Sequence, residues 1–278
     1  MSSSLGVIHS NLLEYTKRSI GSDVERWLAA PNPETNFQSG KDQREPGTGQ
    51  WLVESETYLR WKSSVTRHLW LHGKAGSGKS IMSASIIEDV LSHCENNAEI
   101  GCAFFYFTFS DSSKQSYIDC LRSVVHQLSM HPSISSALEV LYKSSKRSSV
   151  TEETLHKILF DGIRSHKRFF LVLDALDESP ETDSNNTRQR EKLLEWLQDL
   201  SVKLPMLQIL ATSRRLPDIE AELTEMNFHS ESMITASVNV DISKYVVNQL
   251  NQDRNLRELN TGIKKKIEEG FLEKADGM

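Results

Sequence analysis

The sequence predicts an α/β fold in which helices cover both faces of a parallel sheet. Apolar runs of strand length alternate along the chain with segments of helical periodicity. The connections between successive predicted strands are long enough to hold a helix, as a parallel sheet requires. A glycine-rich loop separates the first predicted strand from the helix that follows it. We therefore expect a three-layer sandwich of the P-loop type, with a small helical subdomain after about residue 241.

The glycine-rich loop carries the most specific signal. Residues 73–80 read Gly-Lys-Ala-Gly-Ser-Gly-Lys-Ser and match G-x-x-x-x-G-K-[ST] without a mismatch. Residues 67–72 form an apolar-rich run before the loop, and apolar residues recur at helical spacing from Met82 to Leu91. Glycines let successive N–H groups point into one concavity, and a helix N-terminus adds partial positive charge. The loop therefore predicts a site for nucleotide phosphates.

Individual residues of the loop have expected roles. Lys79 would reach the β- and γ-phosphates, and the Ser80 hydroxyl would ligate Mg²⁺. The expected nucleotide-binding residues are Gly73, Lys74, Ala75, Gly76, Ser77, Gly78, Lys79, Ser80 and Ile81. The alternative is a glycine-rich turn that matches the motif by chance. The predicted strand and helix on either side of the loop argue against this alternative.

A second predicted strand ends in an acid. Residues 169–173 are consecutive apolar residues, which suits a strand buried on both faces, and Asp174 follows them. Asp174 would hold Mg²⁺ directly or through water. Asp177 and Glu178 come next, at the carboxyl edge where open α/β folds bind ligands. One of them could act as a general base on the attacking water, with Glu178 preferred. The alternative is a solvated first turn of a helix.

A third predicted strand, residues 207–211, leads into Thr-Ser-Arg-Arg. A cation at the end of this strand, beside the P-loop, could sense the γ-phosphate and stabilise charge in the transition state. Arg214 is the preferred candidate for this role. The alternative is a surface arginine after a strand.

Together these motifs resemble the NACHT family of signal-transduction NTPases, the STAND class within the AAA+-like P-loop NTPases. The fungal branch of the family is most similar. There a Gly-Thr-Gly-x-Trp-Leu segment precedes the P-loop, and residues 47–52 have this pattern here. Residues 104–111 and 121–123 also resemble that branch. The resemblance covers about residues 27–278.

The resemblance implies a role for each matching position. It implies phosphate binding by residues 73–80, Mg²⁺ at Ser80 and Asp174, catalytic acids at Asp177 and Glu178, and a sensor arginine at Arg214. It also implies that residues 47–51 line the pocket for the base, although packing of Trp51 in a helix would explain that tryptophan equally well. The parent protein would act in fungal innate immunity, as non-self recognition or regulated cell death, and would self-associate when its sensor region is engaged.

These residues bear on three candidate functions. The leading hypothesis is a slow Mg²⁺-dependent NTPase that works as a signalling switch. The second is a nucleotide-dependent oligomerisation or interaction module with little or no hydrolysis, because no arginine finger is identifiable in the sequence. The third, a small-molecule kinase, is disfavoured because the sequence shows no pattern for an acceptor pocket or an arginine-bearing lid. The sequence has no Asn-Lys-x-Asp motif for guanine, which favours ATP over GTP without excluding GTP.

The composition of the chain limits the classes of partner that we expect it to bind. A net charge of −6 argues against a nucleic-acid partner. The only run of three basic residues, 264–266, is followed by Glu268 and Glu269 and is interpreted as a solvated helix face. No apolar stretch approaches the roughly 20 residues that span a bilayer, so no membrane partner is expected. The three cysteines show no metal or redox spacing and suggest a cytoplasmic protein with reduced thiols.

The chain is predicted to have three parts. Residues 1–50 would hold an N-terminal helix and a linker, residues 51–240 the nucleotide-binding core, and residues 241–278 the start of a helical subdomain. Residues 274–278 resemble the beginning of a motif whose remainder is missing, which suggests a truncated chain. Its further partners would then be the effector and repeat domains of a longer parent protein.

Two predictions of local structure accompany this division. The helix would carry Ile20, Val24, Trp27 and Leu28 on one face, and residues 31–50 would form a loop rich in Pro, Gly and polar side chains. Residues 233–240 would form the last strand, with a helical pattern from Asp241 onward.

Overall fold

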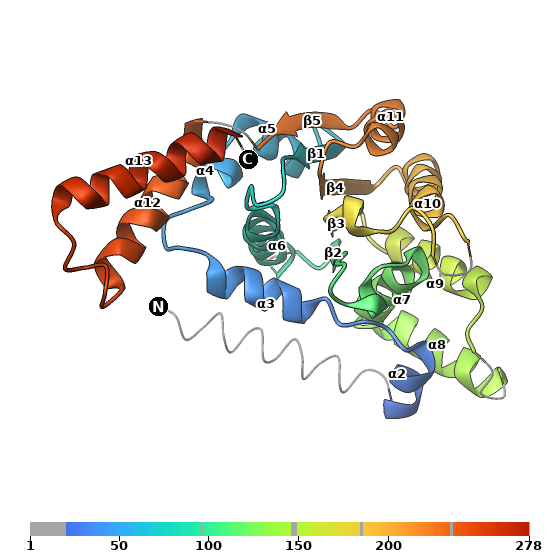
Figure 1. Ribbon diagram of the computed structural model, residues 1–278. Coiled ribbons are helices and arrows are strands. Elements are labelled where there is room, and N and C mark those ends of the chain that lie inside the picture. Colours follow the sequence, from blue (N-terminus) through green and yellow to red (C-terminus); the bar gives the residue numbers. More distant parts are fainter. Residues whose placement is uncertain (1–20, 96, 146–148, 184–185, 234–235, 278) are drawn as a thin grey trace. The chain divides into compact units, whose positions relative to one another are not determined.

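The computed structural model describes residues 21–277, except 96, 146–148, 184–185 and 234–235 (Figure 1). Contacts between Cα atoms divide the chain into two compact units. The first comprises Met1–Pro33, Cys94–Leu171 and Glu178–Leu207, and the second comprises Glu34–His93, Val172–Asp177 and Gln208–Met278. Each unit is built from segments far apart in the sequence.

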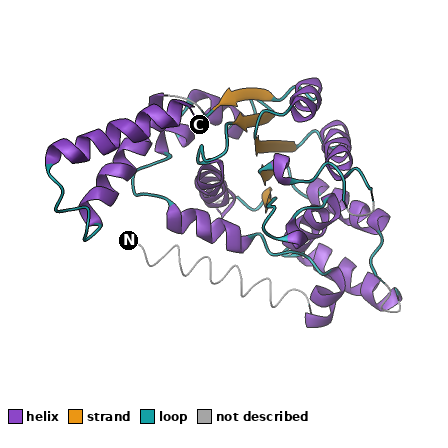
Figure 2. Cartoon of the chain, in the orientation of Figure 1, coloured by secondary structure: helices purple, strands orange, loops and turns teal. Residues whose placement is uncertain are grey.

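Helices and strands alternate along most of the chain (Figure 2). The strands are β1 (His68–His72), β2 (Ile100–Tyr106), β3 (Arg168–Asp174), β4 (Leu207–Ser213) and β5 (His229–Ser232). They form a five-stranded sheet with the order β2-β3-β4-β1-β5. β1 runs parallel to both of its neighbours, β4 and β5, and its residue Leu71 pairs with Thr212. The predicted α/β fold with a parallel sheet is confirmed.

Helices of the first unit are α2 (Ser22–Leu28), α7 (Tyr117–Leu128), α8 (Pro132–Ser144), α9 (Glu152–Arg164), α10 (Gln189–Lys203) and the short η1 (Ser112–Lys114). The second unit holds α3 (Glu34–Gln43), α4 (Gln50–Val53), α5 (Glu56–Lys62), α11 (Pro217–Glu225), α12 (Ala236–Gln252) and α13 (Thr261–Gly277). The long helix α6 (Lys79–Glu95) lies almost entirely in the second unit, and the turn η2 (Leu176–Glu178) ends where that unit gives way to the first.

The core of the second unit forms around β1 and β4. Every residue of β4 is buried, as its apolar sequence predicts for a strand covered on both faces. Two tryptophans contribute large buried side chains without leaving their N–H groups unsatisfied. The Trp61 Nε1 donates to the carbonyl of Ile209 at 3.1 Å, and the Trp70 Nε1 donates to the Ser213 hydroxyl at 2.8 Å. This core is therefore fixed by directional bonds as well as by packing.

The core of the first unit includes the apolar faces of α7 and α9, which pack on each other. Thr151 caps α9 by accepting a hydrogen bond from the N–H of Thr154 at 3.3 Å. Gly162 allows close packing, because a Cβ there would lie 2.9 Å from Leu128 Cδ1. The apolar stripe of α9 is buried, and it consists of Leu155, Ile158, Leu159 and Ile163.

Two predictions of local structure were wrong. Residues 31–50 are not all loop, because α3 occupies Glu34–Gln43. That helix is polar in sequence, and Phe37 and Gly40 are its buried residues, so periodicity gave no signal. Gly40 lets it approach α6 closely, since a Cβ there would lie 2.9 Å from that of Ala84. In the N-terminal helix, Val24 and Leu28 are buried as expected, whereas Ile20 lies outside the described residues.

The last strand was also misplaced. β5 spans His229–Ser232, and α12 begins at Ala236, within the range predicted as strand. β5 is a short polar strand that pairs with β1, so it lacks the apolar alternation that normally marks a strand. The predicted helical pattern from Asp241 onward agrees with α12 and α13, which pack together with Val246 and Leu250 buried.

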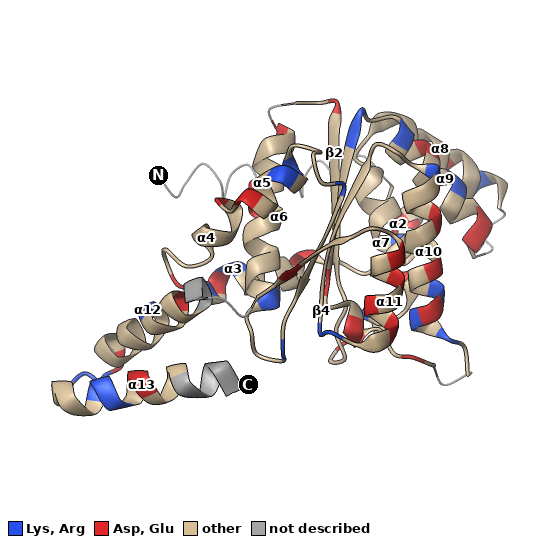
Figure 3. Ribbon diagram, turned by 90° about the horizontal axis from the view of Figure 1, so that it is seen from above, with Lys and Arg blue, Asp and Glu red and all other residues tan. Residues whose placement is uncertain are grey.

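The basic run at residues 264–266 lies on α13, where a blue stretch of ribbon is followed by a red one in Figure 3. Lys265 lies 3.8 Å from Glu269 in an exposed ion pair, and Lys264 donates to the amide oxygen of Asn251 at 2.9 Å. These contacts agree with the predicted solvated helix face. Within the residues that the structure describes, no helix has the length and apolar content needed to cross a membrane.

His68 in β1 is a buried titratable group with a defined hydrogen bond. Its side chain is 2% exposed, and its Nδ1 accepts from the N–H of Ile209 at 3.2 Å. The ring stacks on Phe228 with 4.8 Å between ring centroids. Burial, and then the charge of Arg67, lower the pKa of His68 from 6.5 to about 3. The imidazole is therefore neutral in the folded protein at neutral pH.

This histidine should make the protein less stable as the pH falls. Below about pH 6.5 the unfolded chain binds a proton at His68 that the folded chain does not bind until about pH 3. At about pH 5.5 the free energy of unfolding should be lower by about 1.4 kcal/mol from this group alone. His68→Asn keeps an acceptor for Ile209 and should remove that part of the pH dependence, measured by urea unfolding.

The matched control is His229→Asn, which removes an exposed histidine of the neighbouring strand. It should keep the pH dependence of the wild type. Equal pH dependence in the wild type and His68→Asn would contradict the assignment of a neutral, buried imidazole.

Candidate nucleotide site

The predicted phosphate loop connects β1 to α6 through a turn that requires glycine. The N–H of Gly73 donates to the carbonyl of Ser213 at 3.1 Å, which fixes the start of the loop on β4. A Cβ on Gly73 would lie 2.5 Å from Ser77 Oγ, so no larger residue fits there without a shift. Gly76 and Gly78 have φ angles of 77° and 81°, in the left-handed region. The loop conformation thus depends on the glycines of the motif.

Lys79 folds back over this loop. Its Nζ donates to the carbonyl of Gly73 at 2.9 Å and to that of Lys74 at 2.8 Å. The ammonium group therefore lies against the backbone of the loop that would bind nucleotide phosphates. Lys79 is the first residue of α6, so the positive end of the helix lies at the same place.

Asp174, at the end of β3, is joined to the loop by a hydrogen bond. The Ser80 hydroxyl donates to Asp174 Oδ2 at 2.6 Å. Two further hydroxyls, those of Ser83 and Thr212, donate to Asp174 Oδ1, each at 2.6 Å. Asp174, Ser83 and Thr212 are buried, whereas Ser80 is exposed. The structure thus brings together the two residues predicted to bind Mg²⁺ and adds two hydroxyls to them.

Opposing effects act on the Asp174 carboxyl. Burial raises its pKa, while the hydrogen bonds from the three hydroxyls and the charge of Lys79 act in the opposite direction, and the net shift is upward. A carboxylate and an exposed hydroxyl are hard oxygen donors, which is the donor type that Mg²⁺ prefers. The residues present therefore fit a magnesium ion bound through Ser80 and Asp174.

Asp177 and Arg214 form a pair with each other. Asp177 Oδ1 accepts the backbone N–H of Arg214 at 2.8 Å, and its Oδ2 accepts the Arg214 Nε at 2.5 Å. The Asp177 side chain is buried, and that of Arg214 is 42% exposed. The alternative of a solvated helical turn therefore does not hold for Asp177. The sequence predicted both residues at the site but did not predict that they pair.

The backbone after Asp174 turns sharply, and Thr212 supports the turn. Ala175 has a φ angle of 57°, in the left-handed region that non-glycine residues rarely adopt. Its N–H donates to Thr212 Oγ1 at 2.9 Å. Because the same hydroxyl donates to Asp174, Thr212 connects the acid at the end of β3 to the turn that leads to Asp177.

Glu178 belongs to the first unit and has its own surroundings there. Its carboxylate is partly exposed, and its Oε2 accepts the backbone N–H of Phe109 at 3.0 Å. The side chain of Gln115 donates to the carbonyl of Phe109 at 2.9 Å, and Ser179 Oγ donates to the carbonyl of Gln115 at 3.0 Å. The loop after β2 therefore holds the Glu178 carboxylate by a backbone N–H.

The segment from Gly47 to Trp51 is bound to α12. Asp241 Oδ2 accepts the N–H of Gly49 at 2.7 Å and the indole Nε1 of Trp51 at 3.0 Å, and Lys244 donates to the carbonyl of Gly47 at 3.1 Å. Gly49 has a φ angle of 77° and packs on Met82 of α6, where a Cβ would lie 3.2 Å from the sulfur. The segment thus connects the helix after the phosphate loop to the C-terminal helices.

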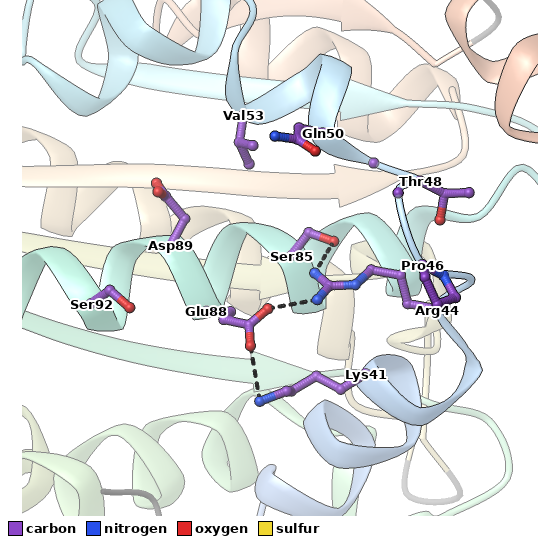
Figure 4. A pocket seen from close by; sticks show the side chains of 12 residues that line it. Lys41, Arg44, Pro46, Thr48, Gln50, Val53, Ser85, Glu88, Asp89 and Ser92 are labelled. Atoms are coloured by element: carbon purple, nitrogen blue, oxygen red, sulfur yellow. Dashed lines mark hydrogen bonds and ion pairs between the residues drawn. The ribbon is translucent and has the colours of Figure 1, made fainter. Parts of the chain in front are cut away.

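A pocket of about 470 Å³ lies beside this segment, between α3, α4 and α6 (Figure 4). Within it, Arg44 donates to Ser85 at 3.0 Å and to Glu88 at 2.8 Å, and Lys41 lies 3.1 Å from Glu88. Burial alone would raise the pKa of Glu88, but hydrogen bonds from the two cations outweigh it and lower the pKa. No residue of the P-loop lines the pocket, so the pocket is separate from the phosphate loop.

Three residues of the site were missed by sequence reasoning. Ser83 lies one helical turn after Ser80 on the same face of α6, which is a weak signal that spacing could have given. Thr212 was predicted only to follow the strand of residues 207–211, as the first residue of the Thr-Ser-Arg motif, without a role of its own. Asp241 gives no signal in sequence, because its partners Gly49 and Trp51 are about 190 positions away.

The fold and the site together define a P-loop nucleotide-binding module of the NACHT type. The chain belongs to the family described as Nephrocystin 3, N-terminal, whose model matches residues 47–214. It is also similar to vegetative incompatibility protein HET-E-1 of Podospora anserina, with 24% identity over 217 residues. That similarity covers 73% of this chain and 15% of the fungal relative, so the chain spans a small part of the relative's length. These comparisons confirm the resemblance to fungal NACHT proteins and the predicted fold class.

The pair between Asp177 and Arg214 should contribute to stability. Asp177→Ala removes a buried carboxylate that accepts two hydrogen bonds. It should lower the free energy of unfolding by about 2–3 kcal/mol, measured by urea unfolding. The neighbouring pair of Arg215 and Glu220 supplies the control, because both side chains are exposed. Glu220→Ala should change stability little. Equal effects of the two variants would contradict the structural role of Asp177.

Proposed function

We propose that this chain binds a nucleoside triphosphate and hydrolyses it slowly with Mg²⁺, with ATP favoured and GTP left open, as a switch in a signalling protein. The observation that carries the proposal is the 2.6 Å hydrogen bond between the Ser80 hydroxyl and Asp174 Oδ2. It joins the loop that follows β1 to a buried carboxylate at the end of β3, although β4 lies between these two strands in the sheet. Membership of the family supports nucleotide binding, and the finer steps below rest on the residues.

The phosphates would be bound by the loop of residues 73–81 and by Lys79. Loop N–H groups and the N-terminus of α6 supply partial positive charge for phosphate oxygens. Lys79 now donates to two loop carbonyls, at Gly73 and Lys74. On nucleotide binding it would exchange these carbonyls for β- and γ-phosphate oxygens, which carry full negative charge and accept stronger hydrogen bonds. The cation therefore already lies at the loop.

The magnesium ion would be held by Ser80 and Asp174. When bound there, Mg²⁺ would supply charge neutralisation for the β- and γ-phosphate oxygens. Asp174 would contribute its Oδ2, and the exposed Ser80 would contribute the lone pairs of its hydroxyl. This assignment uses only oxygen donors already held close together in the second unit.

Glu178 is the proposed general base and Arg214 the proposed sensor of the γ-phosphate. Asp177 is the weaker candidate for the base, because both of its carboxylate oxygens accept hydrogen bonds from Arg214. That pairing gives Asp177 another function, which is to fix the position of the arginine. Glu178 keeps a partly exposed carboxylate whose Oε2 accepts the Phe109 N–H.

A second candidate function is nucleotide-dependent oligomerisation or interaction with little hydrolysis. The hydrogen bond from Phe109 to Glu178 favours it, because the Phe109 N–H already occupies one oxygen of the carboxylate that would have to accept a proton from water. In both cases the nucleotide would act through the segment of residues 47–51, which Asp241 joins to α12. The helices α12 and α13 would then form the subdomain that responds to the nucleotide.

The biological setting is also a proposal. The fungal relative is named for vegetative incompatibility, and we propose that this chain serves a longer cytoplasmic protein in a comparable recognition response. Effector and repeat domains of that protein, and further copies of the chain, would be its partners. Residues 1–50, 51–240 and 241–278 would correspond to the N-terminal segment, the core and the beginning of the helical subdomain.

Phosphate release from Mg²⁺-ATP and Mg²⁺-GTP tests the proposed function. Glu178→Gln should leave nucleotide affinity intact and slow release by about 100-fold or more, because the base is lost. Asp177→Asn should weaken release less, and Lys79→Ala should abolish nucleotide binding, measured with a fluorescent nucleotide. Lys203→Ala is the control, because it removes an exposed lysine that pairs with Asp199 on α10, and it should bind nucleotide normally.

Each outcome discriminates between the candidate functions. Loss of release in Asp177→Asn but not in Glu178→Gln would assign the base to Asp177. A wild type that binds nucleotide without releasing phosphate would favour the oligomerisation module. Unchanged affinity in Lys79→Ala would remove the assignment of the phosphate site.

A further inference from the structure

Two buried hydroxyls, those of Ser83 and Thr212, bind the same oxygen atom of Asp174. Ser83 comes from the second turn of α6 and Thr212 from the end of β4, and both residues are 0% exposed. Each donates to Asp174 Oδ1 at 2.6 Å. The two donors come from different elements, so the position of Oδ1 is fixed from two directions.

The two oxygen atoms of Asp174 therefore have different surroundings. Oδ1 accepts two hydrogen bonds from buried groups, whereas Oδ2 accepts its hydrogen bond from the exposed Ser80. A half-turn of the carboxylate would only exchange two equivalent oxygens, whereas a smaller rotation about the Cβ–Cγ bond would break both bonds to Oδ1. The orientation that presents Oδ2 at Ser80 is thus the one that the buried hydroxyls stabilise.

Thr212 extends this constraint to the backbone. Its Oγ1 also accepts the N–H of Ala175, the residue with a φ angle of 57°. A hydroxyl can donate once and accept at the same time, so both bonds are compatible. The side chain of Asp174 and the turn that follows it are consequently held by a single residue of the adjacent strand.

The structure assigns to Ser83 and Thr212 the role of positioning residues that hold Asp174 so that its Oδ2, beside Ser80, is presented to Mg²⁺. The assignment rests on the proposed function, since it concerns the metal of the nucleotide site. Residues that hold a metal ligand by hydrogen bonds typically change metal affinity about 10–100-fold when removed. Neither residue would contact the ion or the nucleotide.

The test compares variants that lose the hydroxyl with variants that keep it. Ser83→Ala and Thr212→Val remove the donors, Thr212→Ser restores a hydroxyl at the same position, and Ser85→Ala is a control on the same helix. Ser85 binds Arg44 and the carbonyl of Ile81, and neither bond reaches Asp174. The affinity for a fluorescent ATP analogue is measured in EDTA and across a Mg²⁺ titration.

In the expected result, affinity in EDTA stays at the wild-type value in all variants, because the phosphate loop is intact. The Mg²⁺ concentration needed for half of the metal-dependent gain in affinity rises about tenfold or more in Ser83→Ala and Thr212→Val. Thr212→Ser and Ser85→Ala keep the wild-type value. Thr212→Val also leaves the Ala175 N–H without its acceptor, so if that variant does not fold, Ser83→Ala decides alone.

Two results would overturn the inference while nucleotide binding stands. One is an unchanged Mg²⁺ requirement in the folded variants that lack a hydroxyl. The other is an equal loss of affinity in EDTA and in Mg²⁺, which would show general damage to the site. A wild type without measurable affinity for ATP or GTP would instead refute the proposed function, and the inference with it.

Discussion

The site depends on one buried carboxylate. Asp174 is removed from water at the end of β3, and burial alone would make its charged form unfavourable. Hydrogen bonds from Ser80, Ser83 and Thr212 and the nearby charge of Lys79 compensate for part of that loss. Because these groups come from the phosphate loop, α6 and β4, the carboxylate can be accommodated only when those elements are correctly packed. The metal ligand is thus also a structural constraint.

Further polar contacts of the second unit involve the neighbours of Asp174 and of the phosphate loop. Thr212 connects Asp174 to the strained turn at Ala175, and the turn brings Asp177 to Arg214. Separately, Asp241 of α12 binds the segment that packs on α6 immediately after the phosphate loop. A change in the loop therefore has two routes by which it could alter polar contacts elsewhere in this unit, one through β4 and one through α12.

Local patterns in the sequence predicted the fold better than they predicted the polar contacts. The P-loop glycines, the apolar run before Asp174 and the stripe of α9 are local signals, and the structure has the corresponding elements. The polar helix α3 and the edge strand β5 lack such signals, because few of their residues face an apolar core. The partners of Asp177 and Asp241 depend on contacts between distant segments, which one sequence does not reveal. The roles proposed for the site residues stay predictions.

The central claim is that Ser80 and Asp174 act together as one binding site for Mg²⁺. A double-mutant cycle with Ser80→Ala and Asp174→Asn, measured as the Mg²⁺ requirement for ATP binding, tests it most directly. If the two residues hold the same ion, either substitution removes most of the metal-dependent affinity, and the double variant loses little more. Losses that add in the double variant would show independent effects and would contradict the account.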